Sequence, residues 1–87
     1  MDIQIGSAVL SKAGRDKGRF MAVIEMRDGY AWIADGRLRR IEKPKQKNIR
    51  HLGITGTVFT KDQMASNKAL RNALRGRFEG CERDEEV

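Results

Sequence analysis

The central part of the chain, residues 19–36, reads RFMAVIEMRDGYAWIADG and decides the predicted fold. Residues 19–26 are rich in side chains that favour strands, and residues 30–34 form a second apolar run. An aspartate-glycine pair at 28–29 separates the two runs. Because glycine accepts the positive φ that a tight turn requires, this pair predicts a β-hairpin. A second aspartate-glycine pair, at 35–36, predicts another tight turn directly after the hairpin.

Three more short strands are predicted around this hairpin, over residues 5–10, 38–41 and 48–52. Pro44 lies between the last two. Because proline cannot donate to a central strand, we expect a loop or an edge strand at residues 43–47. Five short strands in so few residues predict a mainly β fold, a small and strongly curved antiparallel barrel. Closing the sheet would remove the exposed edges at which other chains can add strands.

The sequence becomes helical in character after residue 58. Thr60 and Gln63 have the spacing of a capping box, in which two side chains satisfy backbone groups at the start of a helix. The apolar side chains that follow recur at nearly helical spacing and predict one helix over residues 61–75. They are Met64, Ala65, Ala69, Leu70, Ala73 and Leu74. Such a stripe packs back on the barrel or docks on a partner protein, and packing is favoured because the core is short of apolar area.

These patterns divide the chain into three parts. We expect a barrel over residues 1–58, a C-terminal helix packed on or next to it within residues 59–78, and a disordered tail over residues 79–87. The tail carries five acidic side chains and one arginine. It either screens a basic face from weak ligands or serves only as a solubilising terminus, and the second interpretation is favoured.

Positive charge dominates the body of the chain. With 87 residues, a formal net charge of +6 and a pI of about 10.0, the chain has room for one small domain and not for a large enzyme scaffold. Residues 12–50 hold twelve basic and five acidic side chains, so we expect an acidic partner, with nucleic acid before an anionic membrane surface. The longest apolar runs have five residues, too short to span a bilayer. The polar, acidic start and the single cysteine, Cys81, predict a cytoplasmic protein without a secretory signal.

A glycine-rich, charged loop joins the first two predicted strands. Gly14 and Gly18 allow the backbone to turn tightly and to approach a partner closely. Four cations project from this segment and can meet phosphates together with backbone N–H groups. They are Lys12, Arg15, Lys17 and Arg19. Composition alone supports an ordinary charged hairpin loop equally well.

This loop and its flanking strands resemble a KOW motif. The residues that carry the resemblance are Ile5-Gly6, Val9-Leu10, Gly14-Arg15-Asp16-Lys17-Gly18 and Ala22-Val23-Ile24. The continuation over residues 28–36 is similar to KOW ribosomal proteins of the large subunit, of the archaeal and eukaryotic kind. The chain also resembles short bacterial proteins described as KOW domain-containing RNA-binding proteins. Many KOW motifs carry a further glycine where this chain has Phe20-Met21-Ala22, so we expect its second strand to leave the loop differently.

The resemblance covers residues 3–52 and leaves the predicted helix and the tail outside. It implies an SH3-like β-barrel that binds RNA, often next to or within the ribosome. The charge and spacing of the residues agree with that implication.

A second group of basic residues follows the hairpin and predicts a second contact face. Its members are Arg37, Arg39, Arg40, Lys43, Lys45 and Lys47. Arginines grip phosphates with paired donors, and lysines act as point charges. A solvated loop kept soluble by lysine is the alternative. RNA contact is favoured because this group adds to the first within one small domain.

Few other residues suggest chemistry. Tyr30 and Trp32 share a strand face, and either can stack on a base. Core filling is favoured for Trp32 and Phe20, which leaves Tyr30 as the candidate for base stacking. His51 is the only histidine, so we expect no metal site and no cofactor. No arrangement of residues suggests an activated nucleophile or an acid/base pair, so we expect no catalytic residue and no enzyme.

The sequence thus predicts a non-catalytic RNA-binding protein that contacts phosphates through the basic loops of a KOW barrel. The expected ligand is ribosomal RNA, and the expected setting is the ribosome or the translation machinery, with ribosomal or other translation proteins nearby. The chain is expected to be a monomer when unbound and to have no membrane partner. The alternative is a protein-binding KOW adaptor of the transcription or translation machinery.

Overall fold

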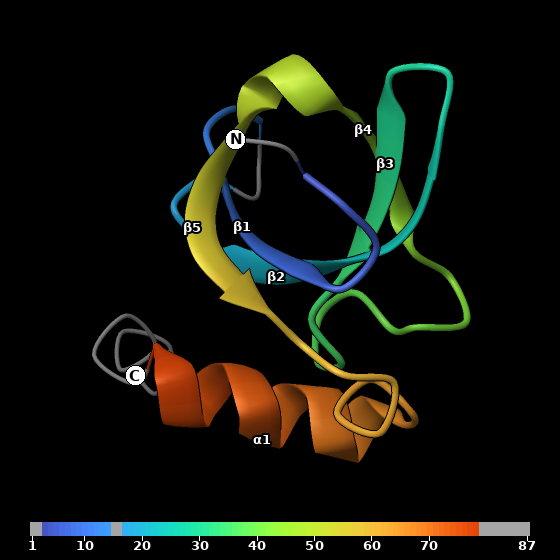
Figure 1. The fold of residues 1–87 in the computed structure, drawn as a ribbon, viewed down its shortest axis with the longest axis vertical. Coiled ribbons are helices and arrows are strands. Elements are labelled where there is room, and N and C mark those ends of the chain that lie inside the picture. The colour runs from blue at the N-terminus through green and yellow to red at the C-terminus, as the bar shows by residue number, and fades with distance from the viewer. Residues whose placement is uncertain (1–2, 15–16, 79–87) are drawn as a thin grey trace.

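The computed structural model of the chain describes residues 3–14 and 17–78. It confirms a mainly β fold with a C-terminal helix (Figure 1). The strands are β1 (Ser7–Ser11), β2 (Phe20–Arg27), β3 (Tyr30–Ala34), β4 (Lys45–Asn48) and β5 (Leu52–Val58). A short 3-10 helix, η1 (Ile49–His51), joins β4 to β5, and α1 (Asn67–Arg77) follows β5. The predicted tail, residues 79–87, lies outside the described residues.

All described strands form one antiparallel sheet of five strands in the order β4-β3-β2-β1-β5. The long central strand β2 pairs with β1 on one side and with β3 on the other. The sheet curves around an interior, as Figure 1 shows. The outer strands β4 and β5 are not neighbours in the sheet of the described residues, so closure into a barrel stays a prediction.

The hairpin predicted from the aspartate-glycine pair is confirmed. Asp28 has a φ of 49° and Gly29 a φ of 84°, and β2 pairs with β3 on either side of this turn. Two consecutive residues with positive φ match the right-handed twist of the flanking strands, which is why such pairs favour hairpins.

Two of the predicted strands are wrong, because short polar side chains offer the backbone local partners instead. Residues 38–41 form no strand, since the carboxylate of Asp35 accepts hydrogen bonds from Arg39 N within this segment and from Arg37 N just before it. The predicted strand over residues 48–52 contains η1, where Asn48 Oδ1 accepts from the Arg50 N–H at 2.9 Å. β4 begins directly after Pro44 as an outer strand, in agreement with the edge strand expected there.

The C-terminal helix begins later than predicted. The capping box does form, because Thr60 N donates to Gln63 Oε1 at 2.9 Å and Gln63 N donates to Thr60 Oγ1 at 3.2 Å. These bonds close a single turn, and the helix starts at Asn67 after a second cap, in which Ser66 Oγ accepts from Ala69 N at 3.1 Å. Thus the sequence holds two caps in succession, and only the second leads into a helix.

The helix packs on a row of alanines that crosses the sheet. Ala8, Ala22 and Ala34 face one another across β1, β2 and β3, and each is at most 1% exposed. Their short side chains let α1 approach the sheet closely, and Leu70 and Leu74 fill the space above them. A second cluster lies on the opposite side of the sheet, inside its curve. It contains Val9, Met21, Val23, Ala31, Ile33 and Leu52.

Candidate nucleic-acid interface

The loop after β3 presents three arginines from a fixed backbone. Asp35 is only 7% exposed, and its Oδ1 accepts from Arg37 N at 2.8 Å and from Arg39 N at 2.9 Å. Asp35 N and Gly36 N both donate to the Arg39 oxygen at 3.0 Å. These four bonds close the chain around the buried carboxylate. We call residues 37–40 the arginine loop.

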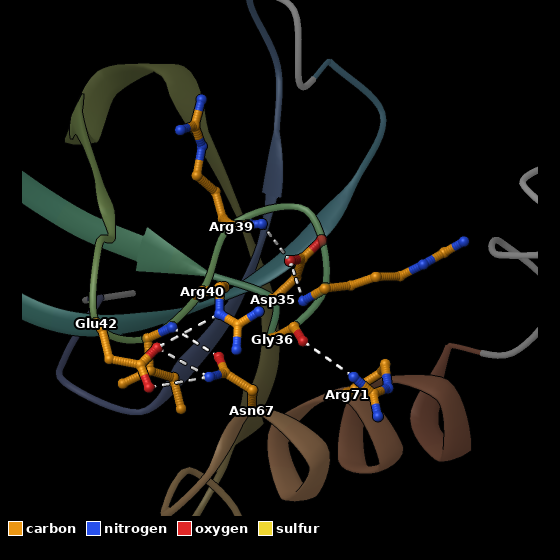
Figure 2. Close-up of polar contacts among 9 residues, drawn as sticks. Asp35, Gly36, Arg39, Arg40, Glu42, Asn67 and Arg71 are labelled. Atoms are coloured by element: carbon orange, nitrogen blue, oxygen red, sulfur yellow. Dashed lines mark hydrogen bonds and ion pairs between the residues drawn. The ribbon is translucent and has the colours of Figure 1, made fainter.

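The first two turns of α1 contact this loop (Figure 2). Arg71 Nη1 donates to the Gly36 oxygen at 3.2 Å, and Asn67 Oδ1 accepts from Ile41 N at 2.8 Å. Gly36 has a φ of 77°, and a Cβ at this position would collide with the Asn67 oxygen. Glycine is therefore required here both for the backbone conformation and for the close approach of the helix.

Glu42 completes this junction. The Asn67 amide donates to both carboxylate oxygens of Glu42, at 2.9 and 3.2 Å. This hydrogen bond, with help from the Glu42 backbone and from nearby Arg40, lowers the pKa of Glu42 below its usual value. Arg40 Nε lies 3.8 Å from Glu42 Oε1, in an exposed ion pair. Part of the Arg40 charge is thus balanced within the protein.

The arginine loop turns cations and one apolar side chain outward. Arg37 and Arg40 are exposed, Arg39 is half-buried, and Leu38 is 60% exposed. Figure 2 shows the Arg39 side chain extending away from Glu42, Asn67 and Arg71. Guanidinium groups on a preordered backbone suit the recognition of phosphates, because little ordering is left to be done on binding.

α1 adds basic residues that the sequence analysis missed. Lys68, Arg71 and Arg75 lie at positions i, i+3 and i+7, so they share one side of the helix, which we call the basic helix face. α1 contains no acidic residue. Arg71 joins this face to the arginine loop through Gly36. The spacing of the three cations is visible in the sequence, whereas the prediction for this helix rests on its apolar stripe.

The first predicted basic face lies on the loop between β1 and β2. Lys12 and Lys17 are exposed and Arg19 is half-buried, whereas Arg15 lies outside the described residues. Gly14 and Gly18 have φ values of 82° and 88°, as a tightly turning loop requires.

η1 brings further basic residues to this first face. Lys12 N donates to the His51 oxygen at 2.8 Å, which places η1 beside the loop, and both Arg50 and His51 are exposed. Sequence spacing gave no sign of this neighbourhood, because it depends on a contact between residues far apart in the chain.

Lys47 has a different environment from the one expected of a residue on a contact face. It pairs with Ala31, so its side chain points to the inner side of the sheet, and it is only 8% exposed. Its Nζ donates to the Ala13 oxygen at 2.7 Å and thereby holds the β1–β2 loop against β4. Lys45 pairs with Ile33, points to the same inner side and is half-buried, whereas Lys43 is exposed.

The two predicted basic faces are not brought together. In Figure 1 the β1–β2 loop lies beside η1, and the arginine loop lies beside the start of α1, at separate places on the molecule. The second group is itself divided, because Lys45 and Lys47 face the interior of the sheet while the arginine loop faces α1 and solvent.

The aromatic residues occupy two environments. Phe20 stacks on Phe78 with ring centroids 4.2 Å apart and an interplanar angle of 2°, against the cluster under α1. Trp32 is half-buried, and the Arg27 guanidinium lies over its ring, 5.5 Å from the centroid. Tyr30 is 40% exposed, as a base-stacking residue must be.

Comparisons with family models and with curated proteins identify no relative of this chain. In residues 3–14 and 17–78 no three His, Cys, Asp or Glu side chains are grouped so that they could hold a metal ion. None of the helices in the described part of the chain is long and apolar enough to cross a membrane.

Because no family model and no curated protein matches the chain, the KOW resemblance stays a prediction.

Proposed function

We propose that this chain is a non-catalytic RNA-binding protein that grips phosphates through the arginine loop and the basic helix face. The observation that carries the proposal is the support of the arginine loop by hydrogen bonds. Buried Asp35 accepts from the backbone N–H groups of Arg37 and Arg39, and Arg71 of α1 donates to the backbone oxygen of Gly36. The KOW resemblance adds ribosomal RNA and the translation machinery as the proposed setting. A cytoplasmic location belongs to the same proposal and rests on composition.

Physical chemistry favours phosphate as the ligand of this surface. A guanidinium donates two parallel hydrogen bonds to a phosphate, and such charge-assisted bonds are about twice as strong as neutral ones. Cations on two adjoining elements, the loop and α1, can meet successive phosphates of one strand. Most of these cations are exposed, so most of the binding free energy should come from counterion release and should depend on salt.

Charge reversal tests the proposal. The double variant Arg39→Glu, Arg40→Glu should bind structured ribosomal RNA at least tenfold more weakly than the wild type at low salt, because it replaces two phosphate contacts with repulsion (about 1.4 kcal/mol per tenfold change). Unchanged affinity at low salt would overturn the proposal.

α1 supplies a matched pair of variants for the same assay. Arg75 and Arg77 are both exposed and lie about 200° apart around the helix, so only Arg75 belongs to the basic helix face. Arg75→Glu should weaken RNA binding clearly more than Arg77→Glu, although the two changes in net charge are identical. Equal losses would show that net charge matters and the face does not.

Leu38 favours one alternative, a protein-binding adaptor. Its apolar side chain is 60% exposed between arginines, where a partner protein could cover it. In that case a protein partner captured by the chain should survive nuclease treatment and be lost in Leu38→Ser, while the same variant should bind RNA normally.

A further inference from the structure

A group of aromatic and polar side chains on β2, β3 and β4 lies apart from the arginine loop and the basic helix face. In the registers of β2, β3 and β4, Tyr30 faces Arg27 on one side and Asn48 on the other. Trp32 likewise faces Glu25 and Gln46. Because paired residues of neighbouring strands point to the same side of a sheet, all six side chains share one side. We call this surface the aromatic face: Glu25, Arg27, Tyr30, Trp32, Gln46 and Asn48.

α1 leaves this face uncovered. The helix packs over the alanine row, which includes Ala34 at the other end of β3 on the same side of the sheet. Tyr30 is 40% exposed, and the Arg27 and Glu25 side chains are 63% and 54% exposed. Exposed Tyr30 and half-buried Trp32 thus lie beside the part of the sheet that α1 covers.

Arg27 lies over one of these rings. Its guanidinium carbon lies 5.5 Å from the centroid of the Trp32 ring, and its Nη2 lies 3.3 Å from Glu25 Oε2. The guanidinium is thus within cation–π distance of the indole, and the 63% exposure of the Arg27 side chain leaves it accessible to a ligand. An arginine in this arrangement extends the aromatic surface by one more planar group.

The charges on the aromatic face argue against phosphate as its ligand. Arg27 is paired with Glu25, and exposed Asp28 lies in the adjoining turn, so the face has no excess of positive charge. It offers π surfaces and the exposed amide of Gln46. Planar, neutral nucleobases are recognised by this combination, through stacking on aromatic and guanidinium planes and hydrogen bonds to base edges.

We propose that the aromatic face binds an unpaired nucleobase of the RNA that the phosphate-binding surface holds, an inference that rests on the proposed function. The base stacks on Tyr30 and the outer side of Arg27, within reach of the Gln46 amide. The neighbouring exposed cation is Arg50, whose backbone N–H donates to Asn48 Oδ1 at 2.9 Å. The RNA that engages both surfaces is therefore structured RNA with an unpaired base, whereas a continuous duplex engages only the arginine loop and the basic helix face.

The chain is well suited to a direct test, because Trp32 is its only tryptophan and Tyr30 its only tyrosine. A single-stranded oligoadenylate of about twelve nucleotides and an RNA duplex of the same length serve as probes. Binding is followed by the anisotropy of labelled RNA and, separately, by Trp32 emission. We expect the single strand to change Trp32 emission, because the base stacks on the Arg27 guanidinium that lies over the indole, and the duplex to bind without this change.

Variants at Tyr30 separate stacking from charge. Tyr30→Leu should weaken binding of the single strand by about tenfold and leave the duplex unaffected, whereas Tyr30→Phe should retain tight binding, because each stacked base contributes strongly to affinity. Arg27→Lys keeps the charge and loses the plane, so it should also weaken binding of the single strand. Circular dichroism checks that each variant is folded.

The outcomes distinguish this inference from the proposed function. Arg39→Glu with Arg40→Glu should weaken binding of both RNAs, whereas Tyr30→Leu should weaken binding of the single strand alone. If the single strand binds with no change in Trp32 emission, or if Tyr30→Leu behaves like Tyr30→Phe, the aromatic face is not a base site and phosphate binding stands. If neither RNA binds, both proposals fail together.

Discussion

Arg71 of α1 donates a hydrogen bond from Nη1 to the backbone oxygen of Gly36 across 3.2 Å, which ties the helix to the arginine loop. The bond joins an element that packs on the sheet to a loop that carries the proposed phosphate contacts. The position of α1 is thus coupled to the shape of the loop. Changes that loosen this junction should therefore affect both stability and RNA affinity.

Asp35 should matter for RNA binding although its side chain is buried. Asp35→Ala removes the acceptor of the Arg37 and Arg39 N–H groups, which should cost about 1–3 kcal/mol of unfolding free energy and lower RNA affinity. Asp35→Asn keeps an acceptor oxygen and should lose less of both. Urea unfolding and RNA titration measure the two effects. A normal RNA affinity in Asp35→Ala would show that RNA binding by the arginine loop does not depend on the hydrogen bonds to Asp35.

Two glycines with similar backbone conformation should respond differently to alanine. Gly29 has a φ of 84° and open space where a Cβ would lie, so Gly29→Ala should cost only the strain of the left-handed conformation, about 1–2 kcal/mol. Gly36→Ala adds a collision with the Asn67 oxygen and should destabilise the protein clearly more. Equal losses in urea unfolding would mean that α1 does not pack against Gly36 as described.

Lys47 should contribute to stability. Lys47→Met keeps the apolar stem and removes the hydrogen bond to the Ala13 oxygen, which should lower the unfolding free energy by about 1–2 kcal/mol. Lys43→Met, at an exposed position, should change it by less than about 0.5 kcal/mol. If Lys47→Met is as stable as the wild type but binds RNA poorly, the residue is a ligand contact, as the sequence alone predicted.

Because the pKa of Glu42 is lowered in the folded protein, the free energy of unfolding should depend slightly on pH. Because the Asn67 amide bonds the ionised carboxylate, the folded pKa lies below the unfolded one. The resulting stabilisation is present above the unfolded pKa and is lost as the pH falls through the folded pKa. Glu42→Gln should therefore be less stable than the wild type at neutral pH, and the difference should shrink in acid. A difference that does not vary with pH would refute the linkage.

Much of the fold was predictable because it follows from local signals. The hairpin at residues 28–29 was predictable because glycine accepts the positive φ that its turn requires. The strand predicted over residues 38–41 failed because the Asp35 carboxylate offers closer partners than a neighbouring strand. The helix start was predicted too early because the sequence holds two caps. The packing of Leu70 and Leu74 on the sheet, which follows the second cap, cannot be read from the capping residues.

The candidate site was less predictable than the fold. Residue types drew attention to arginines 37, 39 and 40, but the contacts that support their loop depend on Arg71 and Asn67, some thirty residues away in the chain. Lys47 was grouped with these arginines because it is near them in the sequence. Its pairing with Ala31 instead points its side chain to the inner side of the sheet, where it bonds the Ala13 oxygen. Long-range contacts decide such cases, and periodicity does not report them.

The dependence of RNA affinity on salt tests the central claim most directly. If the surface neutralises about five phosphates, the logarithm of the association constant should fall with the logarithm of salt concentration at a slope of roughly −3.5 to −4.5. The slope of the Arg39→Gln, Arg40→Gln variant should be less steep, because two phosphate contacts are lost and each contributes roughly −0.7 to −0.9 to the slope. A flat dependence, or the same slope in the wild type and the variant, would contradict phosphate recognition by the arginine loop.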